Sequence, residues 1–237
     1  MPLSKEYSRG PQNIITDDYQ VIRLSEGCPH RCQWCYEWRT IGQNWAIYPV
    51  PQIMKNEVRI TDMNLLAKKE ALDIIRALKD LRANGKVIHY WLVCGIDYRF
   101  LTQEISDALK ASRFIKPHIA WDNHINQDKR VKDAVKMLLK SGYQQRDISI
   151  FMICNHPTIT YEESLYKLEL CKYWNIKVCD CYFDNQLSPN IEPIGWTADQ
   201  IKSFRRQVRK HNQIANFGID PELKSPDPQQ KRLNEIE

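Results

Sequence analysis

The sequence predicts an α/β fold in which six strands alternate with helices and form a parallel sheet. Apolar runs rich in β-branched and aromatic residues begin about thirty residues apart, which is the size of one βα unit. The intervals between these runs carry apolar residues at helical spacing. The six units fall between residues 20 and 215, whereas a complete eightfold barrel usually needs about 250 residues. Periodicity alone leaves a doubly wound sheet and an incomplete barrel both open.

Each predicted strand is a short run that suits a buried sheet, and most are followed directly by polar residues. The carboxyl ends of parallel strands meet at one edge, so this edge is the expected place for an active site. In chain order the runs are YQVIRL from Tyr19, EVRI from Glu57, KVIHYWLV from Lys86, KPHIAW from Lys116, DISIFMI from Asp147 and IKVCDCYF from Ile176.

The clearest helix is predicted in LLAKKEALDIIRALKDLRANG, with Gly85 as the residue just past its end. Two capping boxes predict later helix starts, because Thr160 precedes Glu163 and Thr197 precedes Gln200 by three residues. The stretch WRTIGQNWAIYPVPQIMKNE predicts a loop with at most a short helix. The stripe in the first helix consists of Ala71, Ile74, Ile75, Leu78 and Leu81.

The predicted domain organisation is an N-terminal extension over residues 1–18, one catalytic domain over 19–215 and a loosely ordered tail over 216–237. No apolar run reaches about 18 residues, and the first residues are polar, so we expect a cytoplasmic protein with no membrane partner. The net charge of +5 is mild for 237 residues and permits an anionic partner without requiring one.

Three cysteines lie within CPHRCQWCY, directly after the first predicted strand. A structural zinc site needs four ligands, and His30 is poorly placed between two of the cysteines to close a tetrahedron. A [4Fe–4S] cluster held by three thiolates would leave one iron open for chemistry. Three buried apolar cysteines are disfavoured by the neighbouring His30 and Arg31. The residues favour an iron–sulfur site, with a non-catalytic zinc or iron–sulfur protein as the alternative.

Cys28, Cys32 and Cys35, with the aromatic Trp34 before the last cysteine, match the pattern CxxxCxΦC. On this motif the sequence resembles the radical S-adenosylmethionine enzyme superfamily, over about residues 19 to 190. The resemblance implies a partial (β/α)6 barrel of parallel strands with outer helices. It also implies that the three thiolates hold a [4Fe–4S] cluster whose open iron binds S-adenosylmethionine.

The activity that the resemblance implies is reductive cleavage of S-adenosylmethionine to methionine and a 5′-deoxyadenosyl radical, which abstracts hydrogen from the substrate. The protein would position the cofactors and exclude water and oxygen. An accessible iron makes oxygen sensitivity expected. The electron donor that the family implies is flavodoxin or ferredoxin.

The resemblance also implies cofactor contacts at other strand ends. Asp62 or Asn64, in ITDMNLL, could accept hydrogen bonds from the methionine ammonium group, although either could instead cap the following helix. Tyr36 follows the last cysteine, at the position that lies near the adenine in the family, and Trp34 is a further candidate for cofactor binding. Asp122 or Asn123 is expected at the ribose hydroxyls, and Asn155 is a further candidate for the same cofactor.

Three strand-end patterns, TDMN, GIDYR and AWDN, resemble the subgroup that often carries a separate cobalamin-binding domain. No space for that domain precedes residue 19, so cobalamin is not predicted. Cys94 and Cys154 end predicted strands and are candidate hydrogen-atom donors, or alternatively small buried side chains. Cys171 is expected in the core, and a second cluster at Cys179 and Cys181 is not predicted.

The substrate is expected to be a small molecule or nucleotide, with nucleic acid as the second candidate. The last helix carries Lys202, Arg205, Arg206, Arg209 and Lys210 with no acidic residue between them. Basic and aromatic side chains together suit a nucleotide or nucleic acid, whereas a solvated helix face is the simpler interpretation. Aromatic residues surround the cysteine loop at Trp34, Tyr36, Trp38, Trp45 and Tyr48.

Overall fold

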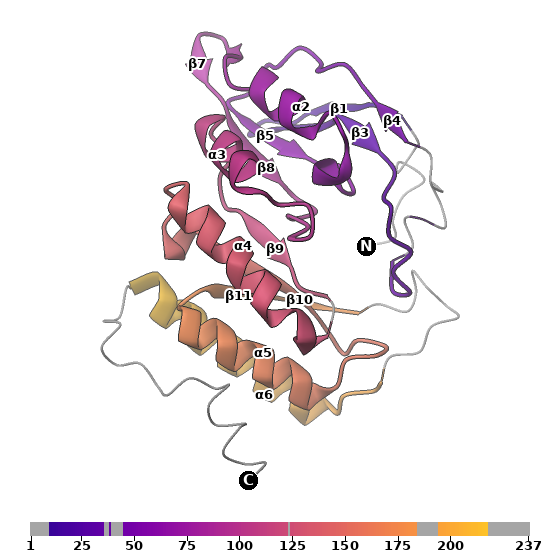
Figure 1. Ribbon diagram of the computed structural model, residues 1–237, viewed down its shortest axis with the longest axis vertical. Coiled ribbons are helices and arrows are strands. Elements are labelled where there is room, and N and C mark those ends of the chain that lie inside the picture. Colours follow the sequence, from indigo (N-terminus) through magenta and orange to yellow (C-terminus); the bar gives the residue numbers. More distant parts are fainter. Residues whose placement is uncertain (1–9, 36–37, 39–44, 123, 184–193, 218–237) are drawn as a thin grey trace. The chain divides into compact units, whose positions relative to one another are not determined.

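The computed structural model describes residues 10–35, 38, 45–122, 124–183 and 194–217 (Figure 1). The chain divides into two compact units, Met1–Pro117 and His118–Glu237. Each unit has its own sheet, with three parallel strands in each. The predicted tail falls almost entirely outside the described residues. The boundaries predicted for the three segments stay a prediction.

The sheet of the first unit has the order β1-β2-β5-β8. Its strands are β1 (Gln12–Ile15), β2 (Gln20–Arg23), β5 (Glu57–Ile60) and β8 (His89–Leu92). β2, β5 and β8 are parallel, as predicted, whereas β1 pairs antiparallel with β2. β1 lies in the segment expected to be an extension.

The core of the first unit forms where the sheet meets its helices. Ile22, Val58, Ile60 and Tyr90 are fully buried on the sheet, and Ile75 is fully buried on α2. Among the described residues, this unit contains the helical elements η1 (Leu65–Ala67), α2 (Ala71–Ala77) and α3 (Gln103–Ala111). It also contains two small antiparallel pairs: β3 (Ser25–Glu26) with β4 (Ala46–Ile47), and β6 (Arg82–Ala83) with β7 (Lys86–Val87).

α2 is shorter than the apolar stripe predicted, and Gly85 does not end it. Asn84 and Gly85, with φ of 51° and 77°, instead form the two-residue loop of the β6–β7 hairpin. Positive φ at both loop positions is the conformation that an Asn-Gly pair favours between antiparallel strands. The helix therefore ends at Ala77, before the last residue of the stripe, and the hairpin takes the segment that follows Leu81.

The second unit has a three-stranded parallel sheet in the order β11-β10-β9. Thr197 and Gln200 form the predicted capping box before α6, with N···O distances of 2.9 and 3.2 Å. α5 and α6 pack against each other and against the sheet. The elements are β9 (His118–Ala120), η2 (Ile125–Gln127), α4 (Asp128–Lys140), η3 (Gln145–Asp147), β10 (Ser149–Cys154), α5 (Tyr161–Trp174), β11 (Lys177–Tyr182) and α6 (Ala198–Phe217).

All six predicted parallel strands are present, three in each unit. The fold is therefore mixed α/β, as predicted, and in the described part of the chain the strands form separate sheets rather than a closed barrel. Over those same residues, no helix is both long and apolar enough to cross a membrane.

Candidate functional site

The loops that follow β2, β5 and β8 meet at the carboxyl edge of the first unit's sheet. Asn64, after β5, connects the other two. Its Nδ2 atom lies 2.8 Å from Asp97 Oδ2, after β8, and 3.8 Å from Cys28 Sγ, after β2. The expected convergence of strand ends is therefore observed in this unit.

Asp97 is the centre of this polar cluster. His30 Nε2 lies 2.9 Å from Asp97 Oδ2, and Arg99 donates from Nε to Oδ1 at 2.7 Å and from Nη2 to Oδ2 at 3.0 Å. Burial by itself raises the pKa of the Asp97 carboxyl, but the bonds and charge of Arg99 outweigh it and hold the pKa below its ordinary value. The carboxylate fixes three side chains beside the cysteine loop.

Two cations lie beside the thiols. The Lys68 ammonium donates to the carbonyls of Glu26 and Gly27, both at 2.5 Å, immediately before Cys28. Burial lowers the pKa of Lys68 to about 8, while nearby Asp62 and Cys28 oppose that shift. Burial also disfavours the charge on Arg99, but its bonds to Asp97, with a smaller contribution from Cys32, raise the pKa of that guanidinium.

The three cysteines of the loop are each partly buried. Cys35 N donates to Cys32 O at 3.1 Å, and Trp38 Nε1 donates to the same carbonyl at 2.8 Å. No three Cys, His, Asp or Glu side chains within the described ranges converge as the ligands of one metal ion. Three thiols with two cations and an amide donor nearby suit an anionic iron–sulfur group, because hydrogen bonds and positive charge stabilise thiolate ligands.

The structure separates the roles of Asp62 and Asn64. Asp62 is buried, with Oδ1 accepting from Leu24 N at 2.8 Å and Oδ2 from Ser25 Oγ at 2.5 Å. Burial raises its pKa to about 6, against these bonds and the charge of Lys68. Asn64 occupies the N-cap position of η1 but makes no side-chain cap bond. The capping alternative is therefore wrong for both side chains.

The other predicted residues of this unit take varied positions. Trp34 is partly buried beside Cys35, and Tyr36 lies outside the described residues. Cys94 is exposed, with Sγ 3.8 Å from Thr61 O, at the end of β8. Its exposure suits the predicted hydrogen-atom donor, although that role stays a prediction.

In the second unit, Asp122 follows β9 and is partly buried, while Asn123 lies outside the described residues. Asn155 follows β10 in a left-handed conformation, with φ of 52°. Its Oδ1 accepts from Gly195 N at 3.1 Å and Trp196 N at 2.8 Å, which ties the start of α6 to the end of β10. The cofactor contact expected of Asn155 stays a prediction.

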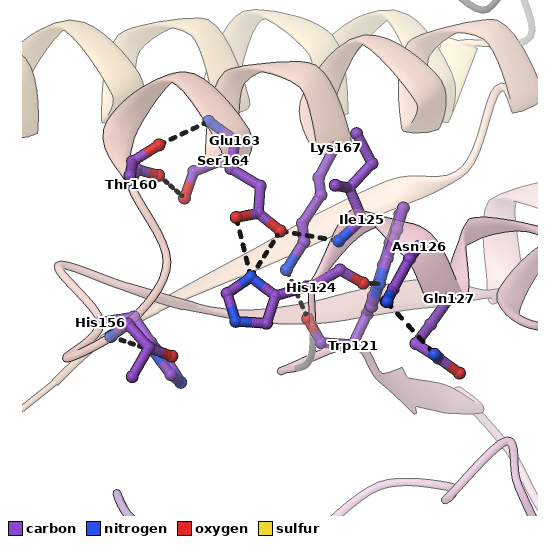
Figure 2. A network of polar contacts seen from close by, with 11 residues as sticks. Trp121, His124, Ile125, Asn126, Gln127, His156, Thr160, Glu163, Ser164 and Lys167 are labelled. Carbon is purple, nitrogen blue, oxygen red and sulfur yellow. Dashed lines mark hydrogen bonds and ion pairs between the residues drawn. The ribbon is translucent and has the colours of Figure 1, made fainter.

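A polar network links the residues after β9 to α5 (Figure 2). Glu163 accepts from Ile125 N at 2.6 Å, and its other oxygen lies 3.0 Å from His124 Nδ1. Thr160 Oγ1 accepts from Glu163 N at 3.1 Å, so the capping box predicted here is only half formed. Glu163 was predicted only as a capping residue, because its partner His124 lies 39 positions away in the sequence.

Lys167 is a second residue of this network that the sequence did not single out. It is buried, and its Nζ lies 3.4 Å from Trp121 O. Figure 2 shows Lys167 pointing toward Trp121. Burial lowers its pKa to about 8, opposed by Glu163 and Asp122. His156 is also buried, and its Nδ1 accepts from Thr158 N at 3.0 Å.

The remaining cysteines belong to the second unit. Cys154 is fully buried, and burial raises its pKa; its role as a hydrogen-atom donor stays a prediction. Cys171 is fully buried, as expected. A hydrogen bond between Cys179 and Cys181 lowers the pKa of Cys179 to about 7 and raises that of Cys181.

No protein-family model matches the chain, and no curated protein matches it in sequence. Among solved structures, the chain is similar to the radical S-adenosylmethionine methyltransferase TsrM from Kitasatospora setae, determined with cobalamin and a [4Fe–4S] cluster bound. The TM-score is 0.57 at 15% identity, over 68% of this chain and 36% of that one. This likeness shows a shared fold, and the chain spans little more than a third of that protein's length.

Proposed function

We propose that this chain is a radical S-adenosylmethionine enzyme built on a partial (β/α)6 barrel, with Cys28, Cys32 and Cys35 holding a [4Fe–4S] cluster. One observation carries the proposal: a CxxxCxΦC loop follows the first parallel strand of a fold shared with a radical S-adenosylmethionine methyltransferase. The cytoplasm, as the expected location, and an electron donor such as flavodoxin or ferredoxin belong to the same proposal.

The bound cluster would supply the electron that cleaves S-adenosylmethionine to the 5′-deoxyadenosyl radical. Around it, Asn64 donates to the Cys28 sulfur, and Lys68 and Arg99 supply positive charge. Asp97 holds Asn64, His30 and Arg99 in place. Asp62 anchors the backbone that leads into the cysteine loop, through Leu24 and Ser25.

Cofactor contacts are proposed for residues at the strand ends. The Asn64 side-chain oxygen suits the methionine ammonium, which needs acceptors. Asp62 would support that contact indirectly, by holding the backbone of Leu24 and the side chain of Ser25, which lead into the cysteine loop. The other candidates are Trp34, Tyr36, Asp122, Asn123 and Asn155.

Two substrate classes are proposed. The first is a small molecule or nucleotide. The second is a nucleic acid, which the exposed basic face of α6 favours. Cys94 is the candidate thiol for hydrogen-atom transfer to or from either substrate.

The test is anaerobic reconstitution with iron and sulfide, followed by dithionite and S-adenosylmethionine. The expected result is a brown protein with broad visible absorbance that forms 5′-deoxyadenosine. Cys28→Ala should lose both, whereas Cys181→Ser, an exposed thiol in the other unit, should keep both. A colourless protein that binds zinc through the same three cysteines would overturn the proposal and favour a non-catalytic metal-binding protein.

A further inference from the structure

The exposed face of α6 carries an unusual concentration of positive charge. Between residues 202 and 210, every exposed residue is cationic. At a rise of about 1.5 Å per residue, these cations span about 12 Å of one helix face. They are Lys202, Arg205, Arg206, Arg209 and Lys210, and they line a groove of about 510 Å³ together with Ala198, Ile201 and Gln213.

The opposite face of α6 is fixed to the second unit. Phe204, Val208 and Ala215 are buried, and His211 Nε2 donates to Ile176 O at 2.7 Å. Asn212 bonds both backbone groups of Val178 on β11, at 2.9 and 2.7 Å. The cations therefore project from a rigid helix that has already buried its apolar surface.

We propose that this basic groove binds the phosphate backbone of a nucleic acid. Three of the five cations are arginines, whose planar guanidinium groups match phosphate oxygens with two parallel hydrogen bonds. None of the five forms an ion pair with a carboxylate in the part of the chain that the structure describes. A polyanion supplies the missing negative charge along the whole groove.

The groove begins near the carboxyl edge of the second unit's sheet. The Arg205 guanidinium lies 4.2 Å from the ring centroid of Tyr182, the last residue of β11. A strand bound along α6 would therefore approach the edge at which this fold class places its chemistry. This inference names a substrate class for the proposed function. Binding of the strand is independent of that function, whereas any chemical modification of the strand rests on it.

Other anionic partners fit the groove less well. A helix that binds a membrane surface inserts an apolar face beside its cations, but here that face is buried in the protein. An acidic protein would place separate carboxylates on the groove, whereas a phosphate backbone repeats its charge at regular intervals along it. The observations favour the nucleic acid.

The experiment measures binding of fluorescein-labelled single-stranded RNA and DNA to the reconstituted full chain by anisotropy, between 50 and 200 mM salt. Five phosphate contacts predict a slope of about −3.5 for log affinity against log salt, or a loss of about 100-fold over this range. The triple variant Lys202→Gln, Arg206→Gln and Arg209→Gln should flatten the slope to about −1.4 and weaken binding at low salt at least about tenfold.

The matched control removes the same charge from another exposed helix face, through Lys129→Gln, Lys136→Gln and Lys140→Gln on α4. Equal losses in the control and the α6 variant would overturn the inference, as would polyglutamate binding as tightly as RNA. Circular dichroism of both variants checks that they fold. A chain that cleaves S-adenosylmethionine but does not bind nucleic acid contradicts only this inference, whereas a chain that binds nucleic acid without taking up a cluster contradicts only the proposed function.

Discussion

Asn64 and Asp97 connect two strand ends of the first unit, with Asn64 Nδ2 2.8 Å from Asp97 Oδ2. The same nitrogen lies 3.8 Å from Cys28 Sγ. Because Asp97 is itself held by Arg99 and His30, the amide is aimed at the sulfur by residues from two other loops. Geometry of this kind allows a protein to adjust the properties of a metal site from beyond its ligands.

Asn64→Ala should lower the reduction potential of the reconstituted cluster, because a hydrogen bond to a thiolate favours the more negative, reduced state. A contribution of one ordinary hydrogen bond corresponds to roughly 20–60 mV for a one-electron couple. A spectroelectrochemical titration measures it. Asn126→Ala, at an exposed amide of the second unit, is the control. An unchanged potential in Asn64→Ala would show that the amide does not act on the sulfur.

Asp62 should make the first unit less stable as the pH rises. Burial raises its pKa from 3.8 to about 6, so the folded state binds the proton more tightly than the unfolded state. This stabilisation is present at low pH and is lost as the pH rises through 6, by about 2 kcal/mol between pH 4 and 7. Urea unfolding of Asp62→Asn should show a correspondingly smaller fall in unfolding free energy over that range. Parallel pH profiles for the two proteins would contradict this.

His156 predicts the opposite dependence in the second unit. Burial, with smaller contributions from Lys167 and His124, lowers its pKa from 6.5 to about 3. Its stabilising effect is complete above pH 6.5 and is lost as the pH falls toward 3, by about 3 kcal/mol at pH 4.5. Urea unfolding of His156→Gln and of the unmodified chain at pH 7.5 and 4.5 separates the contribution of His156 to the free energy of unfolding. The variant should lose less stability on acidification, and an equal loss would exclude His156 as the cause.

Gly85→Ala should destabilise the β6–β7 hairpin. Gly85 has φ of 77° and no atom within 4 Å of the position that a Cβ would take, so only backbone strain opposes alanine there. Left-handed backbone costs a residue with a side chain about 1–2 kcal/mol, which should appear in the free energy of unfolding. Asn84→Gly, at the neighbouring left-handed position, should have a much smaller effect. A loss no larger in Gly85→Ala than in Asn84→Gly would argue against this turn.

The strands were predictable because their pattern is local. Each run needs only a few neighbouring β-branched and aromatic residues, and all six appear where they were expected. β1 was missed because its residues QNII are half polar and largely exposed, and it forms only by pairing with β2 at the edge of the sheet. The length of α2 was overestimated because the apolar stripe continues to Leu81, whereas the helix ends at Ala77 and Asn84 and Gly85 form a hairpin turn instead of a helix end.

Of the candidate site, only the cysteine loop could be predicted from the sequence. The spacing of Cys28, Cys32 and Cys35 is contained in eight residues, so the sequence alone identified them. Asp97 lies in the strand-end pattern GIDYR, but its role in holding His30 and Asn64 depends on loops more than thirty residues apart. Glu163 was predicted as a cap and also contacts His124, because the start of α5 lies beside the loop after β9.

The sequence by itself determined the alternation of strands and helices, the three-thiol loop and the row of cations on the last helix, since each depends on residues close together in the chain. Tertiary structure decided which strand ends meet, that Asp62 supports the backbone while Asn64 faces the Cys28 sulfur, and that Cys154 is buried while Cys94 is exposed. The physical reason is that the neighbours in space of a strand end determine its hydrogen bonding and burial. A local residue pattern does not identify those neighbours, because they lie far away in the sequence.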